Sequence, residues 1–196
     1  MKRYIVALTG ASGSIYAVRL LEELLKTEQE VHFIASDNGK RVLEYELETA
    51  FDSVLEPLYR LGGVLKLHEN DNLFASVASG SFKTSGMAVI PCSMSTLGEI
   101  AAGTSKSLMG RAADVCLKEK RKLVLVPRET PFSPIHLKNM LYLSEIGVTI
   151  LPAMPAFYNK PKTLDDVVSF VVGRTLDALG VGNTLYREWG EEIVDG

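Results

Sequence analysis

The sequence predicts a single α/β domain in which a parallel β-sheet lies between two layers of helices. Short runs of β-branched and other apolar residues recur along the 196 residues, and stretches with helical spacing separate them. Alternating strands and helices form parallel sheets covered on both faces, because each crossover helix packs on the sheet. No repeat or composition break divides the chain. We therefore expect one domain over residues 1–196, with a C-terminal tail from about residue 181.

The first half of the chain begins with a strand, a glycine-rich turn and a helix. Apolar residues from Ala17 to Leu25 recur at helical spacing after that turn. Residues 51–83 lack a clear period, and we expect there a surface excursion poor in strands. The predicted elements of this half are a strand at Tyr4–Thr9, the helix just described, a strand at Val31–Ser36 and a helix from Asn38 to about Glu48.

The second half shows clearer boundaries. Ser133 before Pro134 predicts a helix start, since the hydroxyl caps a free N–H and proline is tolerated at the first helical position. Thr163 and Asp166 resemble a capping box that opens a last helix, which ends before Gly180. The predicted elements are strands at Met87–Pro91, Lys122–Pro127 and Val148–Leu151, and helices at Ser93–Ala102, Leu108–Lys120, Ser133–Ile146 and Thr163–Leu179.

Charge and composition exclude several classes of protein. The 21 Lys and Arg residues against 24 Asp and Glu give a net charge of -3, so no basic field would hold nucleic acid or an anionic membrane. The longest early apolar run, Ile5–Leu8, is too short for a signal peptide, and we expect a cytoplasmic protein. Cys92 and Cys116 form no CxxC and no metal-ligand spacing, which predicts reduced thiols and no metal.

Small and polar residues follow three of the predicted strands. Ligands of open parallel sheets bind at the carboxyl ends of the strands, where helix N-termini converge. The turn Thr9–Gly13, the hydroxyl cluster Ser93–Thr96 and the pair Arg128 and Glu129 all come at such ends, and together they suit an anionic ligand. Each also has a plainer explanation: a packing turn, an N-cap or an ion pair. The turn lacks a P-loop lysine and a complete dinucleotide fingerprint.

Arg111 and Lys118 stand seven residues apart on one predicted helix, which places them on nearly the same face. They could hold one anion together. Asp114 offers a second interpretation, because it is spaced to form an exposed charge ladder with both. From the helix alone, the ladder is favoured.

Seven blocks of sequence, in order along nearly the whole chain, resemble the UbiX-type flavin prenyltransferases. The weakest resemblance falls within residues 51–75. The blocks are Thr9–Gly13, Gly86–Ser93, Arg111–Val115, Leu117–Glu119, Leu123–Glu129, Ile135–Met140 and Pro155–Tyr158.

This resemblance implies a Rossmann-like or flavodoxin-like domain that transfers a dimethylallyl group from dimethylallyl monophosphate to N5 and C6 of reduced FMN. It implies no metal, a homododecamer, and a product that serves as the cofactor of UbiD-type decarboxylases.

The resemblance also implies roles for individual residues. We expect these residues to meet above one edge of the sheet. A leucine, Leu73, stands where the family can place an aromatic residue against the prenyl group. The implied FMN contacts are Gly10, Ala11, Ser12, Ser36, Ser93, Met94, Ser95, Thr96 and Arg128; the implied prenyl-phosphate contacts are Ser79, Arg111, Lys118, Arg128, Tyr158 and Arg174, with Trp189 beside them; and the implied catalytic residues are Glu46, Glu129, Lys118 and Ser12.

Three alternatives are weighed against this interpretation. An FMN-dependent cysteine decarboxylase has a related fold, but it carries an Asn-containing motif and a catalytic His where this chain has Pro91–Thr96. A nicotinamide-dependent oxidoreductase is disfavoured by the incomplete fingerprint. A non-catalytic subunit would bind FMN without reacting with the prenyl donor.

Overall fold

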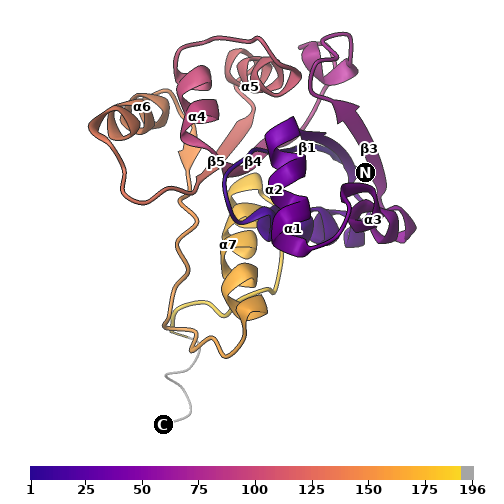
Figure 1. Ribbon diagram of the computed structural model, residues 1–196, viewed down its shortest axis with the longest axis vertical. Coiled ribbons are helices and arrows are strands. Elements are labelled where there is room, and N and C mark those ends of the chain that lie inside the picture. Colours follow the sequence, from indigo (N-terminus) through magenta and orange to yellow (C-terminus); the bar gives the residue numbers. More distant parts are fainter. Residues whose placement is uncertain (191–196) are drawn as a thin grey trace.

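The chain folds around a six-stranded parallel sheet, and the computed structural model describes residues 1–190 (Figure 1). The strand order is β3-β2-β1-β4-β5-β6, so the order reverses between β1 and β4. All five neighbouring pairs are parallel. The strands are β1 (Arg3–Leu8), β2 (Glu30–Ala35), β3 (Val64–Glu69), β4 (Gly86–Cys92), β5 (Lys122–Pro127) and β6 (Thr149–Ile150).

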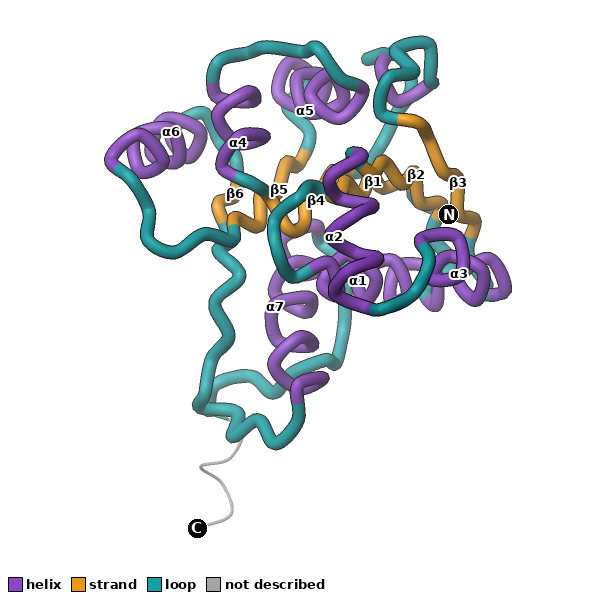
Figure 2. The backbone as a smooth tube through the Cα atoms, viewed as in Figure 1, coloured by secondary structure: helices purple, strands orange, loops and turns teal. Residues whose placement is uncertain are grey.

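Helices cover both faces of the sheet, which confirms the predicted three-layer α/β architecture. In Figure 2, α4, α5 and α6 lie on one side of the strands and α1, α3 and α7 on the other. The helices are α1 (Ser14–Lys26), α2 (Asp37–Leu47), α3 (Phe51–Leu55), α4 (Met94–Ala101), α5 (Leu108–Lys118), α6 (Pro134–Glu145) and α7 (Leu164–Leu179), with 3-10 turns η1 (Glu56–Arg60) and η2 (Ser76–Ala78).

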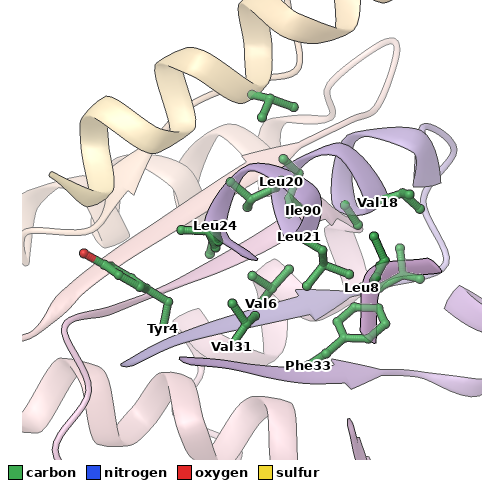
Figure 3. Close-up of a cluster of buried hydrophobic side chains, with 14 of the residues drawn as sticks. Tyr4, Val6, Leu8, Val18, Leu20, Leu21, Leu24, Val31, Phe33 and Ile90 are labelled. Atoms are coloured by element: carbon green, nitrogen blue, oxygen red, sulfur yellow. The ribbon is translucent and has the colours of Figure 1, made fainter. Parts of the chain in front are cut away.

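The central strands are buried on both faces, which explains their continuous apolar runs. Every residue of β2 and β4 is buried, as are the last five residues of β1. Figure 3 shows Leu20, Leu21 and Leu24 of α1 packed on Val6 and Val31 of the sheet. A second cluster on the opposite face includes residues of α4 and α5.

The expectation for residues 51–83 is wrong in one respect, because that stretch contains a strand, β3. This strand lies at the sheet edge and pairs only with β2. Leu65 turns into the core while Lys66 and His68 are more exposed, so its apolar alternation is short. An edge strand with one half-covered face carries a weaker pattern than a central strand.

The other predicted strands and helices are present, and their caps explain where they begin. Ser133 accepts a hydrogen bond from the backbone of His136, and the His136 side chain accepts one from Ser133 N–H. Thr163 and Asp166 form the predicted capping box. Gly180 ends α7 with a φ of 77°, a left-handed conformation that favours glycine.

Within residues 1–190, no helix is long and apolar enough to cross a bilayer. Cys92 and Cys116 are free and buried. Burial raises the pKa of both thiols, which keeps them protonated and poorly nucleophilic at neutral pH. Cys92 therefore packs in the core between the sheet and the helices that cover one face.

Candidate active site

The loops after β1 and β4 meet where the strand order reverses, the usual ligand position of such sheets. The Thr9 hydroxyl donates to the Pro91 carbonyl at 2.6 Å and accepts from Ser93 N–H at 2.8 Å. Thr9 is buried, so these bonds couple the two loops in a protected environment. This role of the Thr9 side chain was not anticipated from the sequence.

The glycine-rich turn is held by a carboxylate from α2. Glu46 accepts hydrogen bonds from Gly13 N–H at 2.9 Å and Ser14 N–H at 2.8 Å, and from the Ser14 hydroxyl. Burial raises the pKa of Glu46, but hydrogen bonds from Ser12, Ser14 and the two amides outweigh burial and lower it. Glu46 is therefore ionised at neutral pH and occupies these two donors of the turn.

Gly10 and Ser36 lie where this turn packs against the start of α2. A Cβ on Gly10 would lie 2.8 Å from the Cβ of Asn38, so only glycine allows this close approach to α2. Ser36 caps α2 by accepting from Gly39 N–H at 3.0 Å. Ala11 is buried beneath the turn, whereas Ser12 is exposed at its tip.

The hydroxyl cluster after β4 forms the start of α4. Ser93 is the N-cap and accepts from Thr96 N–H at 3.2 Å, while its hydroxyl donates to that of Thr96 at 3.1 Å. Met94 and Ser95 occupy the first turn, whose amides have no partner within the helix. Ser95 is exposed. The N-cap interpretation of Ser93 is correct, and the same helix end can also receive an anion.

Arg128 and Glu129 follow β5 at the same edge of the sheet. The Nε of Arg128 donates to the Ser12 carbonyl at 3.2 Å. This bond connects the exits of β5 and β1. The Glu129 carboxylate accepts from Thr130 N–H at 2.9 Å, and its side chain is half-buried. Loops after β1, β4 and β5 thus converge as predicted.

A second group of candidate residues lies along α5. Arg111 donates from Nε to the Ala78 carbonyl at 3.2 Å and pairs with Asp114 at 2.9 Å. The Ser79 hydroxyl lies 2.9 Å from that of Ser81. A Cβ on the adjoining Gly80 would lie 3.2 Å from Lys118 Cε, so the Ser79 segment runs beside Lys118.

Lys118 lies near the amino ends of the strands, whereas Arg128 lies at their carboxyl ends. Lys118 ends α5 four residues before β5 begins, and Arg128 follows the last residue of β5. A six-residue strand spans about 20 Å, so one chain does not bring these residues together. The expected ladder is only partly formed: within residues 1–190, Asp114 pairs with Arg111, and Lys118 instead approaches Glu119 at 3.5 Å.

Tyr158, Arg174 and Trp189 form a third group on α7 and the segments around it. The rings of Tyr158 and Trp189 meet edge-on with centroids 5.1 Å apart. Arg174 donates to the Tyr186 hydroxyl at 3.1 Å and lies 3.6 Å from Asp177. In Figure 1 the N-terminal end of α7 extends away from the sheet, and its C-terminal end lies beside it. Neither Tyr186 nor Asp177 was singled out in the sequence.

Leu73, the position that departs from the family pattern, is 46% exposed, and its neighbour Phe74 is fully exposed. Both lie in the loop between β3 and η2. Neither contributes to the core, so the exposed Phe74 ring is the aromatic group available beside Leu73.

Comparison with known proteins identifies relatives over almost the whole chain. Residues 1–176 match the family described as Flavoprotein. A flavin prenyltransferase UbiX from Halalkalibacterium halodurans is 51% identical over 193 residues, which cover 96% of this chain and 94% of that protein. A flavin prenyltransferase UbiX from Methanocaldococcus jannaschii is 47% identical, with 96% of this chain and 98% of that protein covered.

A solved structure described as AnUbiX (PadA1) in complex with FMN and dimethylallyl pyrophosphate has a TM-score of 0.89 and 39% identity, and covers 96% of this chain and 97% of that one. Identity and coverage of this extent establish common family membership, not only a shared fold. The convergence of the β1, β4 and β5 exits at the reversal of strand order is consistent with that membership. This chain therefore belongs to the flavoprotein family and, within it, to the UbiX flavin prenyltransferases.

Proposed function

We propose that this chain transfers a dimethylallyl group from dimethylallyl monophosphate to N5 and C6 of reduced FMN. The observation that carries the proposal is that the loops containing Ser12, Ser93 and Arg128 meet at the carboxyl ends of the strands. The chain in which they meet is 51% identical to a flavin prenyltransferase UbiX. The related AnUbiX complex with FMN and dimethylallyl pyrophosphate supports the same pair of ligands.

The residues at the β1/β4 edge suit FMN. Glu46 already occupies the amides of Gly13 and Ser14, which directs a phosphate away from that turn. The first turn of α4 offers amides together with the exposed hydroxyl of Ser95. Gly10 packs directly against Asn38 at the start of α2, which fixes the course of the turn that would face the flavin. The remaining implied contacts are Ala11, Ser12, Ser36, Ser93, Met94, Thr96 and Arg128.

Breaking the allylic C–O bond places positive charge on carbon and negative charge on the departing phosphate. Reduced FMN supplies the electron-rich N5 and C6 when bound. Arg111, Lys118 and Arg174 would stabilise the phosphate, each by about 2 to 4 kcal/mol if it acts like an oxyanion donor. Arg128, Ser79 and Tyr158 would add further donors, and Trp189 packs against Tyr158.

Proton transfer is the second requirement. The proton on N5 leaves when the allyl carbon bonds there, and closing the ring needs one proton added to the prenyl double bond and one removed from C6. We assign the removal of the C6 proton to Glu129, directly or through the released phosphate. Glu46 would position Ser12 beside N5, since the Ser12 side chain and the adjoining amides bind its carboxylate. Lys118 would neutralise the leaving group.

The separation of Lys118 and Arg128 within one chain favours a site completed by neighbouring copies. Lys118 and Ser79 lie near the amino ends of the strands, and Arg128 lies at their carboxyl ends. A solved dodecameric FMN-dependent UbiX-like decarboxylase from Escherichia coli O157:H7 has a TM-score of 0.88 and 47% identity, covering 95% of this chain and 98% of that one. We propose a homo-oligomer, with the dodecamer as its expected form.

The product would be prenylated FMN, delivered to a UbiD-type decarboxylase. We propose the cytoplasm as the compartment, where the free thiols Cys92 and Cys116 stay reduced. No metal is needed in this scheme, because side-chain cations neutralise the phosphate.

The deciding experiment is anaerobic incubation of the purified oligomer with reduced FMN and dimethylallyl monophosphate, followed by mass measurement of the released flavin. A gain of one C5 unit is expected. An unchanged flavin mass would reject the proposal, and decarboxylation of a peptide ending in cysteine would favour the cysteine decarboxylase alternative. Flavin binding with neither reaction would indicate a non-catalytic subunit.

Glu129→Gln tests the assigned proton transfer. The variant should bind FMN and release phosphate but close the new ring slowly, because an amide is a poor proton acceptor. Ring closure at the parent rate would show that another group takes the C6 proton.

A further inference from the structure

Asp177 joins the last turns of α7 to the segment that follows the helix. Its Oδ1 accepts from Asn183 Nδ2 at 2.8 Å, and its Oδ2 accepts from the Tyr186 hydroxyl. Asn183 also donates to the Gly173 carbonyl at 3.2 Å. Residues 183–186 are thereby held against α7 by several bonds.

The Tyr186 hydroxyl uses both of its hydrogen-bonding functions. It donates to Asp177 and accepts from Arg174 Nη1 at 3.1 Å. Burial raises the pKa of Tyr186, and the bond to Asp177 raises it further, so the hydroxyl keeps the proton that it donates. The direction of that donation leaves a lone pair for Arg174.

Gly173 allows this contact. A Cβ at this position would lie 2.6 Å from Tyr186 Cδ1, so the tyrosine ring rests directly on the helix backbone. The ring also meets Phe170 edge-on with centroids 5.2 Å apart, and Phe170 in turn meets Tyr158 at 6.0 Å. Tyr186 is therefore fixed both by packing and by hydrogen bonds.

Tyr186 and Asp177 restrain the Arg174 side chain, yet much of it remains exposed to solvent. This side chain remains 54% exposed while Nη1 contacts Tyr186 and lies 3.6 Å from Asp177. A freely rotating arginine must lose rotamer freedom when it binds an anion, and a restrained one has lost part of it already.

We propose that Tyr186 is a positioning residue for Arg174, with Asp177 setting the direction of its hydroxyl. The inference rests on the proposed function, in which Arg174 contacts the prenyl phosphate. Tyr186 acts through Arg174 and does not itself touch the reacting atoms.

Tyr186→Phe removes the hydroxyl and keeps the ring on Gly173 and Phe170. We expect kcat/KM for dimethylallyl monophosphate to fall about tenfold, mainly through KM, as for loss of one hydrogen bond to a charged group. FMN affinity should stay within twofold. Tyr59→Phe, which removes a hydroxyl from an exposed tyrosine on η1, serves as the matched control and should leave both values unchanged.

A double-mutant cycle separates positioning from simple anchoring of the chain. In an Arg174→Ala background, Tyr186→Phe should change KM less than twofold, because the residue it orients is gone. Equal losses in both backgrounds, or no loss in the single variant, would overturn the inference. Gly173→Ala, which displaces the ring but keeps both functional groups, should reproduce the rise in KM.

The failure of this inference can be told from failure of the proposed function. If the parent enzyme adds no C5 unit to FMN, the proposed function fails. If it does so and Arg174→Ala retains the parent KM, the phosphate contact of Arg174 and the role of Tyr186 fail while the activity stands.

Discussion

The Glu46 carboxylate lies 2.6 Å from the Ser14 hydroxyl, and the pair ties α2 to the first turn of α1. Ser14 is completely buried, so this bond is shielded from water. The carboxylate takes the place at a helix N-terminus that an external anion could otherwise occupy. This arrangement makes Glu46 a residue on which the shape of the turn Thr9–Gly13 depends.

Glu46→Ala should lower both stability and FMN affinity, because Gly13 and Ser14 lose their acceptor. Leaving buried donors unpaired costs about 1 to 3 kcal/mol. Thermal unfolding and flavin titration would measure the two effects. Full FMN affinity in a variant with a lowered Tm would show that the turn recovers its shape without the carboxylate.

Lys118→Ala distinguishes the phosphate contact from a surface ion pair with Glu119. For a phosphate contact, prenyl transfer should slow about 100-fold, as on removal of one oxyanion donor, while FMN binding persists. The pair with Glu119 is exposed and contributes at most about 1 kcal/mol to stability. Lys138→Ala on α6 is the matched control. Full activity with a small stability change would leave Lys118 only its surface pair with Glu119.

Stability should fall in mild acid because of His32. Its ring is buried, lies 2.8 Å from His68 and 3.2 Å from Glu30, and meets Phe82 edge-on. Burial, and then the charge of His68, lowers the pKa of His32 from 6.5 to about 4. Between these values the unfolded chain takes up a proton that the folded chain refuses, so the free energy of unfolding decreases as pH falls.

Urea unfolding at several pH values would measure this slope, and His32→Gln should flatten it between pH 6.5 and 4. Lys66, which also faces the pair, bonds to Glu30 and holds the Glu30 pKa at about 2, so the contribution of that carboxylate is lost only in stronger acid. An unchanged slope in the variant would assign the acid sensitivity elsewhere.

Leu24→Ala should destabilise the fold by about 2 to 5 kcal/mol, because the side chain is fully buried between α1 and the sheet (Figure 3). Leu164→Ala is the control, since Leu164 is 75% exposed at the start of α7 and its loss should stay within about 0.5 kcal/mol. Denaturant unfolding would compare them. Similar losses would contradict the placement of Leu24 in the core.

The sequence predicted the central strands well because burial on both faces leaves continuous apolar runs, as in Met87–Pro91. It failed for β3, whose Lys66 and His68 interrupt the pattern by turning toward a polar cluster around Glu30. Polar partners contributed by a neighbouring strand leave no local signature. The edge strand therefore looked like a loop.

The site was predictable only where it follows the strand ends. Position in a parallel sheet places Ser12, Ser93 and Arg128 at one edge, because strand exits share a side. Contacts between distant segments, such as those of Glu46 with the turn or Tyr186 with Arg174, depend on packing that no spacing encodes. Lys118 lies near the amino ends of the strands because α5 runs back across the sheet and ends just before β5 begins.

That course of α5 has a genetic consequence. If each active site takes its Arg and Lys residues from more than one subunit, a defective subunit also inactivates sites that it shares with normal subunits. A defective allele would then be dominant-negative over a normal one. Conversely, two alleles with substitutions in different groups of site residues can together form some complete active sites. Such pairs of alleles would show intragenic complementation.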